Sequence, residues 1–206
     1  MNRIVHGAVR RDLDRLSTAL GRLGDGDLAR AGALQRAFAN LRAELTRHHE
    51  GEDTHIFPML QRVGVDEDLL AAMESEHHAM ADALAETSGA MSAVARTGSS
   101  ADAVAAQASV DRTREVVERH LRHEEDELEP RLAPHLASPE WKAVEKKLSR
   151  QPLGIAGRFF AWLTDGMSEE NRAFLKKTVP SPVVTLLAKT FGRRYYKDVA
   201  PTWRSR

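Results

Sequence analysis

The sequence predicts an all-α protein, with an up-down-up-down four-helix bundle over residues 1–137 and an extension of short helices over residues 138–206. The first part is rich in alanine and poor in β-branched residues, and its apolar residues recur at helical spacing in four long runs. Residues 1–138 hold 16 arginines, no lysine and 24 acidic residues, a net charge of −8, whereas residues 139–206 have a net charge of +8. All nine histidines precede this change, which marks a structural boundary near Ser138.

The composition, 42% hydrophobic and 29% charged, is that of an ordinary globular chain and excludes a fibrous or wholly disordered protein. There is no cysteine, which excludes disulfides, thiolate zinc sites, iron–sulfur clusters and cysteine nucleophiles. The N-terminal residues carry charge too early for a signal peptide, and no apolar run approaches the roughly 18 residues of a membrane span. We therefore expect a cytoplasmic protein.

Each predicted helix has an apolar stripe and a defined end. The stripes cover residues 9–23, 34–59, 70–94 and 106–128. The chain is expected to turn at residues 24–26, around residues 58–64, at residues 97–100, and at Pro130 and Pro134. Long amphipathic helices joined by short turns are typical of a bundle whose successive helices are antiparallel.

Histidine and glutamate interrupt the apolar stripes. Six positions where the pattern requires leucine are His48, Glu52, His55, His77, His120 and Glu124. His6 lies on the first stripe, three residues before Val9. Because a buried unpaired carboxylate is costly, these polar residues need partners or a metal ion.

The polar positions also fall at one height of the predicted bundle. The start of the first helix, the end of the second, the start of the third and the end of the fourth share one end, which brings together His6, His48, Glu52, His77, His120 and Glu124. Imidazole with carboxylate suits iron, manganese or zinc, and two carboxylates that can bridge favour a two-metal site. Two octahedral ions need about twelve bonds, of which these groups and a bridging oxygen supply about ten, so roughly two positions stay open for a small ligand.

Four segments resemble the hemerythrin-like, or HHE cation-binding, domain: HGAVRRDLDRL at 6–16, HHEGEDTHIFPML at 48–60, EHHAMADAL at 76–84 and HLRHEEDELEP at 120–130. The resemblance covers residues 1 to 137. It implies a four-helix bundle around a non-heme diiron centre, two iron ions joined by an oxo or hydroxo bridge, with the same six residues as ligands. Oxygen-carrying members use a further histidine where this chain has Met73, so the resemblance implies an extra open position here and argues against reversible oxygen carriage.

For other polar residues near the predicted centre, the sequence allows several roles. His49, His78 and His123 are expected on the flanks of the bundle, in a solvated or supporting role. His55 is expected on the seam, as an extra ligand, a proton donor or a buried spectator. A ferritin-like site would use the Glu-x-x-His pairs at Glu52 and Glu74, but the first helix has no glutamate and the fourth has the opposite order.

The extension contains too many apolar groups for a free linker and is expected to pack. Its +8 charge complements the −8 of the bundle, and we expect it either to fold over the open end as a lid that brings Tyr195 or Tyr196 near the metal, or only to stabilise the bundle. No nucleic-acid-binding signature is present, and an anionic membrane surface is a weaker alternative for its dispersed lysines and arginines.

The expected function is to bind or sense oxygen, nitric oxide or hydrogen peroxide at open iron positions. The alternatives are a catalase-like or other oxidoreductase acting on peroxide or nitric oxide, and iron sensing or storage through metal-dependent folding. The sequence does not identify a protein partner or an electron donor.

Overall fold

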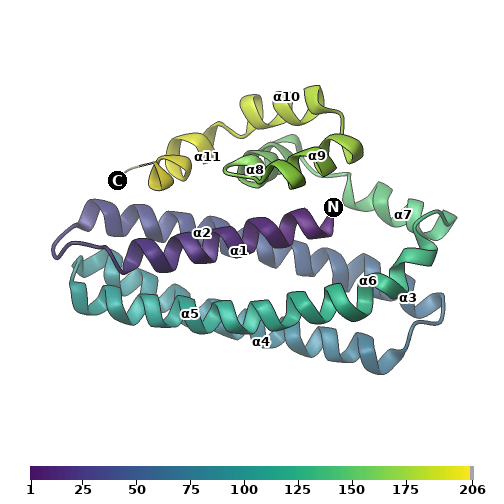
Figure 1. Ribbon diagram of the computed structural model, residues 1–206, viewed down its shortest axis with the longest axis horizontal. Helices are drawn as coiled ribbons and strands as arrows, with labels where there is room; N and C mark the ends of the chain where they lie inside the picture. The colour runs from purple at the N-terminus through teal and green to yellow at the C-terminus, as the bar shows by residue number, and fades with distance from the viewer. Residues whose placement is uncertain (205–206) are drawn as a thin grey trace.

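The computed structural model describes residues 1–204, which form helices and no strand. The four longest helices are α1 (Asn2–Leu20), α2 (Leu28–Gly51), α4 (Glu67–Thr97) and α5 (Ser100–His123). They lie side by side with successive helices antiparallel (Figure 1), and each packs against two neighbours in the cyclic order α1, α2, α4, α5. The all-α prediction is confirmed. Among the described residues, none of the helices is both long and apolar enough to cross a membrane.

Three of the four bundle helices, α2, α4 and α5, begin at side-chain caps that the sequence supplies. The carboxylates of Asp27 and Asp66 accept hydrogen bonds from the main chain at the starts of α2 and α4, and the Ser99 hydroxyl does so at the start of α5. Helix α4 ends at Gly98, whose left-handed φ of 63° suits glycine. The caps at Asp27, Gly98 and Ser99 fix the turns at one end of the bundle, and Asp66 caps α4 at the opposite end.

Two π-helical turns carry α2 and α5 past their last α-helical residues. η1 (Glu52–Ile56) leads into α3 (Phe57–Arg62), and η2 (Glu124–Leu128) leads into α6 (Glu129–Leu132). In each turn a main-chain N–H reaches back five residues, from Phe57 to the Glu52 carbonyl and from Glu129 to the Glu124 carbonyl. A proline stands six residues after each glutamate, and its missing N–H and bulky ring disfavour continued α-helix. The same local sequence pattern therefore produces the same bulge twice.

The π-helical turn also changes which residues of this segment face inward. One extra residue in the turn rotates His55 away from the seam. In this position His55 is only half-buried. Phe57 faces the interior instead, and its ring lies parallel to that of His77 with the centroids 5.4 Å apart. The expectation that His55 lies on the seam is wrong for this reason.

A short 3-10 turn, η3 (Ala133–His135), precedes the extension. The extension consists of α7 (Pro139–Leu148), α8 (Leu153–Thr164), α9 (Glu169–Thr178), α10 (Ser181–Phe191), α11 (Arg193–Asp198) and a 3-10 turn, η4 (Ala200–Trp203). Helix α7 packs on η1 and α3, while α8 to α11 run back along the face formed by α1 and α2 (Figure 1). Gly157 lets α8 and α10 approach closely, since a Cβ there would collide with the Phe191 Cβ.

The extension and the bundle share one apolar core. Trp162 of α8 is fully buried in the same cluster as Leu13 and Leu16 of α1, and its indole N–H donates to the Asp12 carboxylate at 2.8 Å. Most polar contacts between the two parts join arginines of the acidic bundle to acceptors of the basic extension. Arg3 pairs with Glu170 at 2.6 Å, and Arg11 donates to the Trp162 carbonyl at 3.2 Å. Local pairing, rather than the opposite net charges, accounts for these contacts.

Candidate metal centre

Seven side chains converge at one height of the bundle, in two groups. One group contains His49, Glu52, His77 and His120, and the other contains His6, His48 and Glu124; within each, one donor atom per residue lies within 4.8 Å of the others. Together they are called the donor cluster here. All six residues of the sequence-based ligand set belong to it, and His49 is the addition.

The two glutamates span the two groups. Glu52 Oε1 lies 3.3 Å from His48 Nε2, and Glu52 Oε2 lies 3.7 Å from His77 Nε2. In the same way, Glu124 Oε2 lies 3.1 Å from His6 Nε2 and 3.9 Å from His120 Nε2. Each carboxylate therefore faces a histidine of both groups, as a bridging ligand between two metal ions would.

The donor cluster holds an unusual concentration of buried polar atoms without partners. The Nε2 atoms of its five histidines, both carboxylate oxygens of Glu52 and Glu124 Oε2 are buried and have no hydrogen-bond partner among the described residues. Each such group costs about 1–3 kcal/mol when left unsatisfied. Five imidazoles and two carboxylates, without a thiolate, form the donor set of a first-row transition metal, so the residues fit a metal centre.

Carboxylates behind the histidines fix the direction of three rings. His6 Nδ1 lies 2.7 Å from Glu125 Oε1, His77 Nδ1 lies 2.7 Å from Asp53 Oδ1, and His120 Nδ1 lies 2.9 Å from Glu76 Oε2. A ring whose Nδ1–H donates to a carboxylate presents the lone pair of Nε2, which is how metal-binding histidines are usually oriented.

The two π-helical turns place these acids in matched pairs. In η1, Glu52 faces the donor cluster and the next residue, Asp53, holds His77 of α4. In η2, Glu124 faces the donor cluster and the next residue, Glu125, holds His6 of α1. Each turn therefore supplies one donor and one supporting acid to a neighbouring helix.

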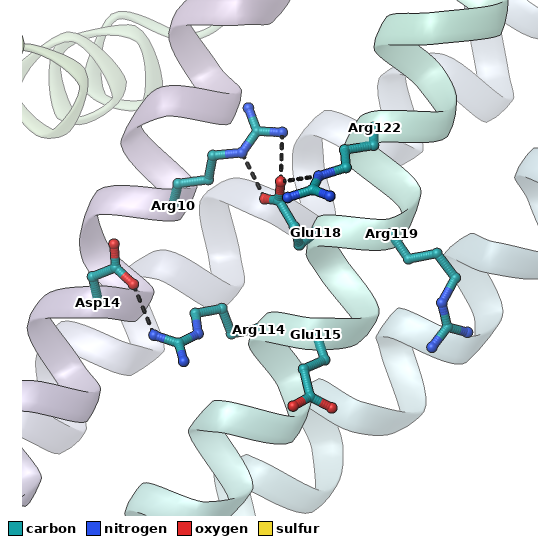
Figure 2. Close-up of a pocket in the computed structure, with 7 residues that line it drawn as sticks. All are labelled: Arg10, Asp14, Arg114, Glu115, Glu118, Arg119 and Arg122. Carbon is teal, nitrogen blue, oxygen red and sulfur yellow. Dashed lines mark hydrogen bonds and ion pairs between the residues drawn. The ribbon is translucent and has the colours of Figure 1, made fainter.

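One support reaches the surface between α1 and α5. Arg10 donates to Glu125 at 2.8 Å and to Glu118 at 2.7 Å, and Arg122 donates to Glu118 at 2.7 Å. Figure 2 shows Arg10 and Arg122 converging on Glu118. These residues line a surface groove of about 580 Å³. His6 is thus tied through Glu125 to a network of charged groups at the surface.

Burial and charge shift the pKa values of the metal-free cluster. Burial, and then the neighbouring Glu124, raises the pKa of Glu52. Burial opposes protonation of His6, but the nearby Glu124 carboxylate and the hydrogen bond with Glu125 outweigh it and raise the pKa of His6 to about 9. Burial lowers the pKa of His48 to about 3, so this ring stays neutral with a free lone pair.

The remaining sequence-predicted residues lie in different places. His49 is only 6% exposed, so the expectation that it lies on a flank is wrong, whereas His78 is exposed. His123 is half-buried and its Nδ1 lies 2.9 Å from Glu76 Oε1. Met73 is fully buried, in an apolar cluster with Met59 and Leu60 rather than in the donor cluster.

Neither tyrosine reaches the donor cluster. The Tyr195 hydroxyl donates to Asp165 at 2.9 Å, and Tyr196 lines a separate pocket formed by α8 to α11. The element over this end of the bundle is α7. Its residues Trp141, Val144 and Leu148 pack on an apolar cluster that includes Phe57, which contacts His77. The structure therefore differs from the expectation that brought a tyrosine to the metal.

Sequence reasoning missed the supporting acids Asp53, Glu76 and Glu125. Each directly precedes or follows a donor residue in the sequence, so a search next to the donors would have found them. The repeated proline six residues after a seam glutamate is the corresponding signal for the two π-helical turns.

Comparison with protein families shows to which family the chain belongs. Residues 3–132 match the family described as "Hemerythrin HHE cation binding domain", a segment that contains the whole donor cluster and all four bundle helices except the first residue of α1. No curated protein and no solved structure matches the chain. With more than half of its length matched, and with a buried histidine–glutamate cluster inside the match, the chain belongs to the hemerythrin HHE cation-binding domain family.

Proposed function

We propose that this protein is a non-heme diiron protein that binds or senses a small ligand such as oxygen, nitric oxide or peroxide. The observation that carries the proposal is the donor cluster, where five unpartnered Nε2 atoms meet two carboxylates that each face both groups. Two adjacent ions with bridging carboxylates match this pattern better than one ion, which seven protein donors would overfill.

The proposal gives each residue of the sequence-based ligand set a role. His6 and His48 hold one ion, His77 and His120 hold the other, and Glu52 and Glu124 connect the two. When bound, the two irons supply reversible electron transfer and coordination positions for a small ligand. The chain's own residues orient the rings through Asp53, Glu76 and Glu125 and keep bulk water out.

The surroundings of the donor cluster support a small uncharged ligand. Apolar side chains lie on both sides of it, with Val9 and Leu121 in the bundle core and Phe57 and Met73 in the end cluster. Such walls favour a diatomic molecule or peroxide over a larger polar substrate, because a polar substrate would lose its hydration without compensation.

A second candidate function is an oxidoreductase that decomposes peroxide or nitric oxide. It is favoured by the chain His123–Glu76–His120, whose links of 2.9 Å run from a half-buried ring to the donor cluster. Such a chain can move a proton between the cluster and the surface, which a peroxide-decomposing reaction requires.

The test loads the metal-free protein with ferrous iron anaerobically, measures iron per chain, and records the optical spectrum as oxygen is admitted. We expect two irons per chain. A colour that disappears under vacuum supports ligand binding, and oxygen evolution on addition of peroxide supports the oxidoreductase. Iron content well below two, unchanged by His120→Ala, contradicts the diiron proposal.

A further inference from the structure

We propose that His49 is a metal ligand through Nε2. It fills a position in the group with His77 and His120 that the third bundle helix, α4, leaves without a histidine, because α4 has Met73 one turn before His77. This inference rests on the proposed metal function. It changes that function in one respect, because the substitution of methionine at position 73 then leaves no additional open coordination position.

The placement of His49 on α2 makes this role geometrically available. Neighbouring residues of an α-helix point about 100° apart, so one of two adjacent histidines usually faces outward. Here both face the interior, because α2 packs between α1 and α4. The His48 ring lies 5.5 Å from that of His6 on α1, and the His49 ring lies 4.3 Å from that of His77 on α4. The pair therefore serves both groups of the donor cluster.

The atom that would bind is buried and without a partner. His49 Nε2 makes no hydrogen bond with any described residue, and the ring is 6% exposed. One ring nitrogen of His49 lies within 4.8 Å of donor atoms of Glu52, His77 and His120. Donors about 2.1 Å from one ion lie at most about 4.2 Å apart, so the group needs only a small contraction to bind an ion.

Packing alone does not account for a histidine at this position. The ring stacks on His77 with an interplanar angle of 17°, a contact that an apolar side chain could also make without burying an unpaired nitrogen. A metal ion satisfies this nitrogen together with the unpartnered Nε2 atoms of His77 and His120. With His49 included, three imidazoles belong to one group and two to the other.

The position of Met73 explains why α4 provides one imidazole only. Met73 lies one turn before His77 and is fully buried in the apolar end cluster with Met59 and Leu60. A thioether is a poor ligand for an ion held by imidazole and carboxylate. The missing nitrogen donor thus comes from the neighbouring helix.

The experiment compares His49→Leu with His78→Leu. His49 is buried and follows His48, whereas His78 is exposed and follows His77. Cobalt(II) is the probe, titrated into the metal-free full-length protein against a chelator, with d–d absorption reporting coordination. We expect His49→Leu to weaken one cobalt site at least tenfold and to change its absorption, while His78→Leu behaves like the wild type. The metal-free His49→Leu protein should be at least as thermally stable as the wild type, since an orphan nitrogen is gone, but gain less stability from cobalt.

The inference is overturned when His49→Leu binds two cobalt ions with wild-type affinity and absorption. If the leucine variant does not fold, His49→Gln is compared with His78→Gln in the same titration. A wild type that binds fewer than two ions contradicts the diiron proposal, yet a single bound ion lost in the His49 variant still supports His49 as a ligand. A wild type that binds no cobalt or iron overturns both.

Discussion

At the scale of single residues, the acids behind the histidines distinguish this cluster from a chance grouping of polar side chains. Glu125 bonds to His6 Nδ1 and also accepts from Arg10, so its carboxylate is held between the donor cluster and the surface. The hydrogen bond with His6, together with that from Arg10, lowers the pKa of Glu125 to about 2. The support is therefore charged throughout the neutral range.

Glu125→Gln should weaken metal binding roughly 10–100-fold while leaving the fold intact, because the amide no longer orients and polarises the His6 ring as a carboxylate does. Competition with a chelator measures the loss, and circular dichroism checks the fold. Asp126→Asn is the matched control, since it removes the same charge from the next residue, which is exposed. Equal effects of the two variants would show that only net charge matters.

Metal affinity should rise with pH between about 6 and 9 and change less above that range. His6 has a pKa of about 9 in the metal-free chain, and a proton on this ring competes with the metal for Nε2. Each proton released on metal binding changes the affinity by about tenfold per pH unit. Chelator competition at several pH values therefore gives the number of protons released. His6→Gln should lower both the affinity and this slope. An affinity that does not depend on pH below 9 would contradict the pKa given for His6.

The convergence of six donor residues could be predicted at this scale, because each occupies a seam position on a regular helix. His49 could not be predicted in the same way, since a strict helical repeat places only one of two adjacent residues inside. The supporting acids stand next to donors in the sequence, but which histidine each one holds depends on contacts between helices, such as that of Glu76 of α4 with His120 of α5.

At the scale of elements, the two π-helical turns give the bundle its special geometry. Each places a donor glutamate and a supporting acid at consecutive positions, Glu52 with Asp53 and Glu124 with Glu125. The sequence predicts that the helices stop near the prolines that follow, but the chain continues helically through both turns. The missing N–H of proline does break the α-helical hydrogen-bond pattern, but it does not end the helix here.

Deleting Thr54, an exposed residue inside η1, should convert the turn to regular α-helix and leave the bundle folded, because a π-helical turn is an α-helix with one extra residue. The deletion should move Asp53 away from His77, which then loses its hydrogen bond to this carboxylate. Metal affinity should therefore fall at least tenfold. Thermal unfolding followed by circular dichroism, with a cobalt titration, checks both.

The comparison for this deletion is removal of Thr46, an exposed residue in the regular part of α2. It rotates every later residue of the helix by about 100° and should abolish cooperative unfolding. If removing Thr54 is equally disruptive, η1 is required for the fold and not only for the centre.

At the scale of the whole molecule, the extension behaves as part of the bundle's core rather than as an attachment. Trp162 is buried against α1 and donates to the buried Asp12 carboxylate, which also binds Arg11 at 2.7 Å. Sequence composition located the change of character near Ser138, and the apolar residues of the extension predicted that it packs. The face on which it packs depends on contacts such as this one, which composition does not encode.

Trp162→Ala should lower the free energy of unfolding by about 3–5 kcal/mol, because it opens a cavity and removes the partner of a buried carboxylate. Urea unfolding of the metal-free protein, followed by both circular dichroism and tryptophan fluorescence, measures the change. Phe174→Ala is the control, since that ring is 46% exposed, and should shift the stability little. Two separate transitions in the wild type would contradict a shared core.

The position of α7 has a consequence for the rate at which a ligand arrives and leaves. The donor cluster lies between two apolar clusters, and α7 closes the nearer end with Val144 and its neighbours. If the proposed function holds, a gas molecule that enters at this end would pass when packed side chains briefly separate, so its arrival and its departure would be slowed together. The residence time of the ligand would then depend more on the fluctuations of α7 than on the strength of the bond between metal and ligand. Weaker packing of α7 would speed both binding and release at nearly constant affinity.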